Sequence, residues 1–264
     1  QLVYITRADI WNAIKKRTDF NNNLRALTRR AAECTAMYGT RNGAGANDKR
    51  LPWASSLTMA LLYYYAVDRR YRDVTATLSG RLSYRVSVSD GVTANALTTN
   101  TDLGYAGILL LVPQNVVNGS YCAYSAEEKM WYDHWKDHLF YAIANEYRPS
   151  ASQPTVACTS ATCLAISDTA NTLTHTYYAA FVIFAGEKLS GQNRNTLSDK
   201  SQISNYLEGR NAGNHPNSSG SANYEGASAG GTFNDFVYAI HETTLAVSCY
   251  DAASGTMMAA PSAA

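Results

Sequence analysis

The sequence predicts an α+β fold, in which a long N-terminal α-helix packs on an antiparallel β-sheet head with long loops. Residues 9–38 contain neither proline nor glycine, which indicates one continuous helix. Later segments contain short alternating or continuous apolar runs, which predict strands. Residues 190–232 are rich in Asn, Ser and Gly, and we expect them to form a long surface loop. We therefore divide the chain into a helical stem, residues 1–39, and a β-rich globular head, residues 40–264.

The composition favours an extracellular protein. Of the 264 residues, 16% are charged, below the ~25% of a typical domain. Together with the 19 tyrosines, this indicates a surface whose polarity comes mainly from uncharged side chains. The net charge of +1 provides no overall field for binding nucleic acid or an anionic membrane. The charge is nevertheless uneven, because residues 1–38 hold seven Lys and Arg against three acidic residues.

The stem carries one apolar stripe. Its members recur at steps of four and three residues, as expected for one face of a helix. We expect the stripe to pack the stem against the head through Phe20, Leu24, Leu27, Ala31, Cys34 and Tyr38. Gly39 follows as the predicted C-cap. At ~1.5 Å per residue the helix would be about 45 Å long.

The head contains the predicted strands. Residues 74–88 alternate on both sides of Gly80, which predicts a hairpin or one bulged strand. Ser125 and Glu128 form a capping-box pattern before a short helix over Lys129–Trp135. A second short helix, Ile203–Leu207, is predicted within the long loop. Apolar runs predict the further strands Gly107–Val112, Leu139–Ile143, Cys163–Ser167, Tyr177–Phe184 and Phe233–Ala246.

The five cysteines favour a disulfide rather than a metal cluster. No CxxC pair occurs, as most zinc sites would require. Cys158 and Cys163 are close enough in sequence to close a small loop, which would imply an oxidising compartment. The alternative is that all five are buried free thiols. The pairing of Cys34, Cys122 and Cys249 stays open.

No segment in the sequence serves as a membrane anchor or a signal peptide. No run reaches the ~18 apolar residues of a membrane helix. The first residues also lack the charged-then-apolar order of a signal peptide. We expect a targeting segment to have been removed from a secreted chain of this composition.

Two patterns resemble catalytic motifs without meeting their requirements. Gly226–Gly230 has the spacing of a nucleophile elbow around Ser228, but loop-like sequence flanks it on both sides. We interpret it as a small flexible turn. His134 and His138 are four residues apart on a predicted helix, but Trp135 stands where a zinc motif has Glu. We interpret that segment as a polar helix face, with metal binding as the less favoured alternative.

One candidate binding patch interleaves aromatic rings with cations. Such a patch can stack on bases and contact phosphates of single-stranded nucleic acid, or hold a sugar or a partner protein. The alternative is a helix end that packs its tyrosines on the core. The patch comprises Tyr63, Tyr64, Arg69, Arg70, Tyr71 and Arg72.

Several segments resemble large bacterial proteins of the type IV pilin-like class, which share a prepilin-type N-terminal helix. The matches span residues 20–240 in the expected order, although Lys136 replaces a usual glycine. They also include the spaced cysteines 158 and 163. The matching segments are Leu51–Ala54, Tyr132–Ala142, Ala179–Gln192, Asn205–Ala212 and Thr232–Asp235. By this resemblance, Gln1 would fall just after an apolar half-helix that is not in the sequence.

The resemblance implies a pilin-like fold and a structural or adhesive role, as a minor pilin or pseudopilin without catalytic site, metal or cofactor. Its partners would be other pilin subunits, met through the N-terminal helix, and a surface ligand. The full-length protein would be anchored in the inner membrane before assembly into a cell-surface filament. Two alternatives stay open: a pilus-borne receptor for DNA uptake that uses the Tyr/Arg patch, and a metal-dependent surface hydrolase that uses His134 and His138.

Overall fold

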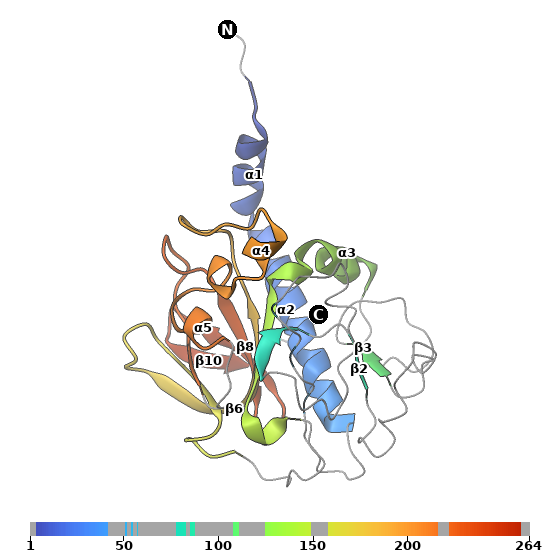
Figure 1. The fold of residues 1–264 in the computed structure, drawn as a ribbon, viewed down its shortest axis with the longest axis vertical. Helices are drawn as coiled ribbons and strands as arrows, with labels where there is room; N and C mark the ends of the chain where they lie inside the picture. The colour runs from blue at the N-terminus through green and yellow to red at the C-terminus, as the bar shows by residue number, and fades with distance from the viewer. Residues whose placement is uncertain are drawn as a thin grey trace.

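The computed structural model shows a mixed α+β fold (Figure 1). Short helices and a mainly antiparallel sheet alternate along the chain, which confirms the predicted class. None of the helices in the described part is long and apolar enough to cross a membrane. The structure describes residues 4–41, 51, 54, 57, 78–82, 85–87, 108–110, 125–148, 158–215 and 222–259, with side chains in the first segment described as far as residue 36.

The N-terminal region forms two helices, α1 (Arg7–Lys15) and α2 (Thr18–Arg41), so the prediction of one helix over residues 9–38 is wrong. The helix is interrupted at Lys16 and Arg17. Polar side chains compete with the backbone there, because the Asn21 amide donates to the carbonyl groups of both Lys15 and Arg17. The second helix also continues past Gly39, which therefore is not its C-cap.

Eight strands of the described chain form one sheet, with β6 at its centre. The strands in order across the sheet are β1 (Ser79–Arg81), β4 (Leu139–Ile143), β6 (Thr174–Phe184), β8 (Phe236–His241), β9 (Val247–Asp251) and β10 (Thr256–Ala259). β5 (Leu164–Ser167) pairs antiparallel with the first part of β6, and β7 (Asn223–Glu225) pairs parallel with β5. All other pairings are antiparallel.

The predicted strands Leu139–Ile143, Cys163–Ser167 and Tyr177–Phe184 are confirmed by β4, β5 and β6. The predicted strand Phe233–Ala246 is confirmed only over β8, because a turn follows His241. The prediction for residues 74–88 fails. β1 pairs with β4, whereas β2 (Arg85–Ser87) pairs with β3 (Ile108–Leu110) in a separate two-stranded sheet. The expected hairpin or bulged strand is therefore wrong. Gly80 lies inside β1, where it is buried against β4, instead of marking a turn.

The core lies between α2 and the sheet. β4 is buried along its whole length, as is the second half of β6, and α2 lies across β6, β8 and β9. Leu24, Leu27 and Ala31 of the predicted stripe are buried, and Phe20 packs against the core from its edge. The side chain of Tyr38 lies outside the described residues.

The described parts of residues 190–232 are folded and partly buried, so the expected long surface loop is wrong for them. The segment contains α4 (Leu197–Lys200), α5 (Gly209–Gly213) and β7. The predicted short helix is a 3₁₀ turn, η5 (Ile203–Asn205). Tyr206 links the segment to the sheet, because the guanidinium carbon of Arg81 in β1 lies 4.8 Å from the centroid of its ring.

The predicted short helix after Ser125 is confirmed, and two short 3₁₀ turns were not predicted. Ser125 and Glu128 form the predicted capping box of α3 (Ala126–Trp135). The 3₁₀ turns η3 (Lys136–His138) and η4 (Asn145–Tyr147) flank β4.

The described cysteines include two in a confirmed disulfide. Cys158 and Cys163 are bonded as predicted, with 5.1 Å between their Cα atoms. Cys34 is also disulfide-bonded, whereas Cys249 is a free thiol. The alternative of five free thiols is therefore wrong.

Candidate functional site

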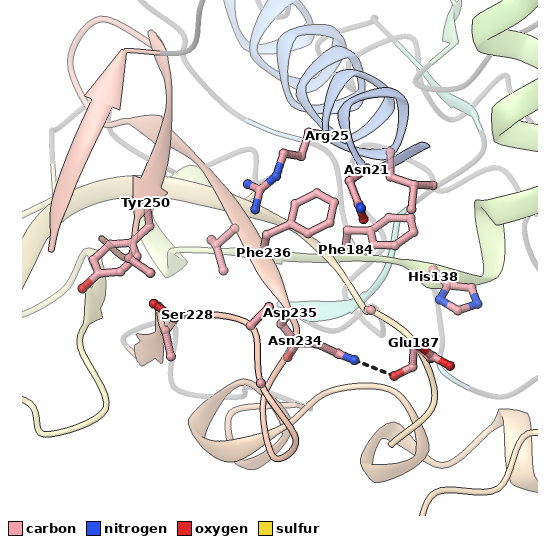
Figure 2. A pocket seen from close by; sticks show the side chains of 18 of the residues that line it. Asn21, Arg25, His138, Phe184, Glu187, Ser228, Asn234, Asp235, Phe236 and Tyr250 are labelled. Carbon is pink, nitrogen blue, oxygen red and sulfur yellow. Dashed lines mark hydrogen bonds between the residues drawn. The ribbon is translucent and has the colours of Figure 1, made fainter. Parts of the chain in front are cut away.

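A cavity of about 1140 Å³ lies where the two N-terminal helices meet the sheet (Figure 2). Residues of α1 and α2 form one wall, and β8 with the β9–β10 hairpin forms another. The segments Gly186–Leu189 and Gly226–Gly230 border the remaining sides. We call it the helix–sheet cavity. Its volume is of the size that takes a small ligand.

Aromatic rings hold α1 against the head beside this cavity. Trp11 of α1 stacks on Trp135 of α3 with 6.0 Å between ring centroids, and the edge of Phe20 meets both indoles. An ion pair between Lys15 and Glu187 ties the end of α1 to the segment after β6. These contacts fix α1 from its middle to its C-terminal end, although none of its residues is buried.

The floor of the cavity is apolar, and Arg25 of α2 reaches over it. Phe184 of β6 and Phe236 of β8 stack with 4.9 Å between centroids. The guanidinium carbon of Arg25 lies 4.8 Å from the Phe236 ring centroid. Figure 2 shows this guanidinium reaching from α2 beside the ring. A cation over an aromatic face is stabilised there by the charge distribution of the ring.

Two carboxyl groups and two amides form a buried hydrogen-bond network beside the cavity. The Glu208 backbone N–H and the Asn211 amide each donate to Oδ2 of Asp235 at 3.1 Å. The Glu208 carboxylate accepts from Nε2 of Gln192 at 2.8 Å and from the Asn234 backbone N–H at 3.1 Å. Burial raises the pKa of Asp235 well above its ordinary value, and the charge of Glu208 raises it further. Asp235 therefore keeps its proton at pH values where an exposed aspartate is ionised.

The network joins two segments that the sequence analysis singled out separately, Asn205–Ala212 and Thr232–Asp235. Asn211 also bonds both backbone groups of Glu225, at 2.8 and 3.2 Å. Gly209 allows the close approach: its φ is +51°, and a Cβ there would lie 2.2 Å from Oε2 of Glu225. The two segments are thus complementary parts of one structural unit that shapes the cavity wall.

The two histidines of the possible metal motif are in different environments. His134 is exposed, whereas His138 contacts the rings of Trp135, Phe184 and Tyr206. Burial lowers the pKa of His138 to about 4, opposed by a hydrogen bond with the Ala185 carbonyl. In the described part of the chain, no group of three or more His, Cys, Asp or Glu side chains is placed to hold a metal ion.

Ser228 lies on a loop between β7 and β8, and its side chain is exposed at the cavity. A nucleophile elbow needs a strand before the serine and a helix directly after it. Here a loop and then β8 follow, so this serine lacks the position of an elbow nucleophile. The segment is an irregular loop of small residues without an assigned turn, and it borders the cavity, which the sequence did not reveal.

The predicted Tyr/Arg patch stays a prediction. Its residues lie outside the described part of the chain: Tyr63, Tyr64, Arg69, Arg70, Tyr71 and Arg72. The cavity was missed because no local pattern distinguishes Arg25 from the other basic residues of α2. Phe184 and Phe236 form the floor of the cavity only because β6 pairs with β8.

Comparisons of the chain with models of known protein families, with curated proteins and with solved structures gave no match.

Proposed function

We propose that this chain is a structural or adhesive subunit, of the minor pilin or pseudopilin kind, in a type IV pilus or a related secretion filament. The observation that supports this proposal is the position of α1, which extends beyond the head with the N-terminus at its far end (Figure 1). Tyr4, Ile5 and Ile10 are 81%, 73% and 53% exposed in and before this helix. Large apolar side chains on a projecting element favour contact with another protein surface.

The division between a fixed and a free part of the stem agrees with this role. α2 is held by its buried stripe, so it belongs to the core of the head. α1 is held from its middle onward by Trp11 and Lys15, which leaves its first turn available to neighbouring subunits. Assembly would then proceed by burial of the apolar surface of α1, and the proposal includes no catalytic step or cofactor.

The location and partners follow from the same proposal. The full-length protein would be anchored in the inner membrane before assembly and would lie at the cell surface in the filament. Its partners would be other pilin subunits through the N-terminal helix. The disulfide between Cys158 and Cys163 is compatible with an oxidising environment.

The test replaces one exposed apolar residue of α1 in the cells that naturally make the protein. Ile10→Asp removes apolar contact surface, and Asn12→Asp adds the same charge at an exposed polar position of α1. Filaments are sheared from the cells, and the protein is quantified by immunoblot in the sheared and whole-cell fractions. We expect Ile10→Asp to lower the filament fraction at least tenfold, at an unchanged whole-cell amount, and Asn12→Asp to leave it unchanged.

Absence of the wild-type protein from sheared filaments would overturn the proposal. Equal incorporation of both variants would overturn the assigned role of α1. A DNA receptor is not proposed, since no described residue favours it.

A further inference from the structure

We infer that the helix–sheet cavity binds a small ligand consisting of a carboxylate attached to an apolar body, with Arg25 as the residue that recognises the carboxylate. This inference is independent of filament assembly. It follows from the groups that line the cavity and from the hydrogen-bond partners they lack.

The charged groups of the cavity leave Arg25 available. The basic residues that line it are Lys15, Arg25, Lys188 and Arg194. Lys15 pairs with Glu187, and Arg194 donates to the carbonyl groups of Asn205 and Gly186. Arg25, by contrast, contacts the ring of Phe236 and acts electrostatically on Cys249 and Asp251, but among the described residues no hydrogen bond or ion pair engages its guanidinium. Lys188 is exposed and adds positive charge near the same space.

The acidic residues of the cavity are already engaged. Asp251 is the carboxylate that acts on Arg25 at longer range, but its own oxygens accept from the Ala253 backbone N–H at 3.2 Å and the Ser254 hydroxyl at 2.6 Å. Asp235 belongs to the buried network with Glu208. Neither carboxylate therefore occupies the donors of Arg25.

The small-residue loop supplies further donors. Within the described part of the chain, the Ser228 hydroxyl and the backbone N–H groups of residues 227–229 have no hydrogen-bond partner. Figure 2 shows Ser228 and Arg25 reaching toward the cavity from two different elements, the loop and α2. The short side chains of the loop leave this space open, while Gly226 packs directly against the ring of Tyr250.

The chemistry of the ligand follows from this arrangement. A guanidinium binds a carboxylate through two parallel hydrogen bonds, and one face of Arg25 is already covered by the Phe236 ring. The stacked rings of Phe184 and Phe236 provide a floor for an apolar body. A dianion such as phosphate fits less well, because one unpaired guanidinium would face it while Asp251 lies nearby. A cavity of about 1140 Å³ suits a small molecule.

The experiment uses 4-(trifluoromethyl)phenylacetate as probe and follows its fluorine NMR signal during titration with the protein at pH 7. The neutral control ligand is the corresponding amide, which has the same apolar body without the charge. Arg25→Met removes the recognising group, and Arg7→Met is the matched control, since it removes the same charge from an exposed position on α1. Ser228→Phe places a bulky ring in the cavity from an exposed loop position, so it tests the site even if Arg25→Met fails to fold.

We expect saturable binding of the acid, with the amide at least about tenfold weaker, as for the loss of a charge-assisted hydrogen bond. Arg25→Met should weaken the acid by about tenfold or more and leave the amide unchanged. Arg7→Met should bind as wild type does, and Ser228→Phe should lose both ligands. Equal affinity for acid and amide, no saturable binding by wild type, or unchanged binding by folded Ser228→Phe would each overturn the inference.

Discussion

Substitution of Asp235 tests the buried network that joins the two motif segments. In Asp235→Ala, the Glu208 backbone N–H and the Asn211 amide lose the acceptor that each contacts at 3.1 Å. A buried donor left without a partner costs about 1–3 kcal/mol. Loss of both acceptors therefore predicts a decrease of about 2–5 kcal/mol in the free energy of unfolding, part of it offset because a buried carboxyl is also removed.

Asp235→Asn is the matched variant, because it keeps an oxygen acceptor and the size of the side chain. Its amide can donate to the Glu208 carboxylate, replacing the proton that Asp235 holds in the wild type. The pKa of Asp235 is raised in the folded state, mainly by burial and then by Glu208. Its contribution to stability is therefore fully present below the unfolded pKa of ~3.9 and is lost as the pH rises through the folded pKa. Asp235→Asn lacks this dependence.

Urea denaturation of the three proteins between pH 4 and 8, followed by circular dichroism, measures these differences. We expect Asp235→Asn to become more stable relative to wild type as the pH rises, and Asp235→Ala to be the least stable protein at pH 7. Two results would refute the reasoning. One is an unfolding free energy of Asp235→Ala equal to that of wild type. The other is a difference between Asp235→Asn and wild type that does not change with pH.

Two further predictions concern other buried groups. The folded pKa of His138 is about 4, lowered by burial, so acid should destabilise the protein as the unfolded chain takes up protons below pH ~6.5. His138→Phe should reduce this loss, measured as the change in unfolding free energy from pH 7 to pH 5, and an unchanged slope would contradict the prediction. Arg81 donates to the carbonyl groups of Asp137 and Lys200, at 2.5 and 2.6 Å. Arg81→Met should lower the unfolding free energy by about 2–4 kcal/mol in urea, since both carbonyls lose a charged donor. A loss below about 1 kcal/mol would show that these bonds contribute little.

Much of the sheet was predictable because its signal is local. The segments Leu139–Ile143 and Tyr177–Phe184 are continuous apolar runs, and both form central strands. The Ser125 capping box and the disulfide between Cys158 and Cys163 also depend on residues a few positions apart. In such short-range patterns, the residues that cause the structure are neighbours in the sequence, so the structure can be predicted from them.

Most of the features that were missed depend on contacts between distant residues, and the helix break is the local exception. The helix break at Lys16 arises where polar side chains satisfy the backbone, although the helix-forming pattern continues through it. The apolar residues around β1 and β2 alternate as in a hairpin, yet β1 pairs with β4 and β2 pairs with β3. Glu208 and Asp235 appeared only as parts of separate motifs, and their meeting across the chain could not be inferred from spacing.

The break between α1 and α2 also determines how the molecule would bear a mechanical load. A continuous helix would carry a pull on its N-terminus straight into the core through its backbone hydrogen bonds. Here the pull would first reach the stack of Trp11 on Trp135 and the ion pair of Lys15 with Glu187. These contacts can separate while α2 stays seated on the sheet. We therefore expect the junction to yield to a pull on the N-terminus before the head unfolds.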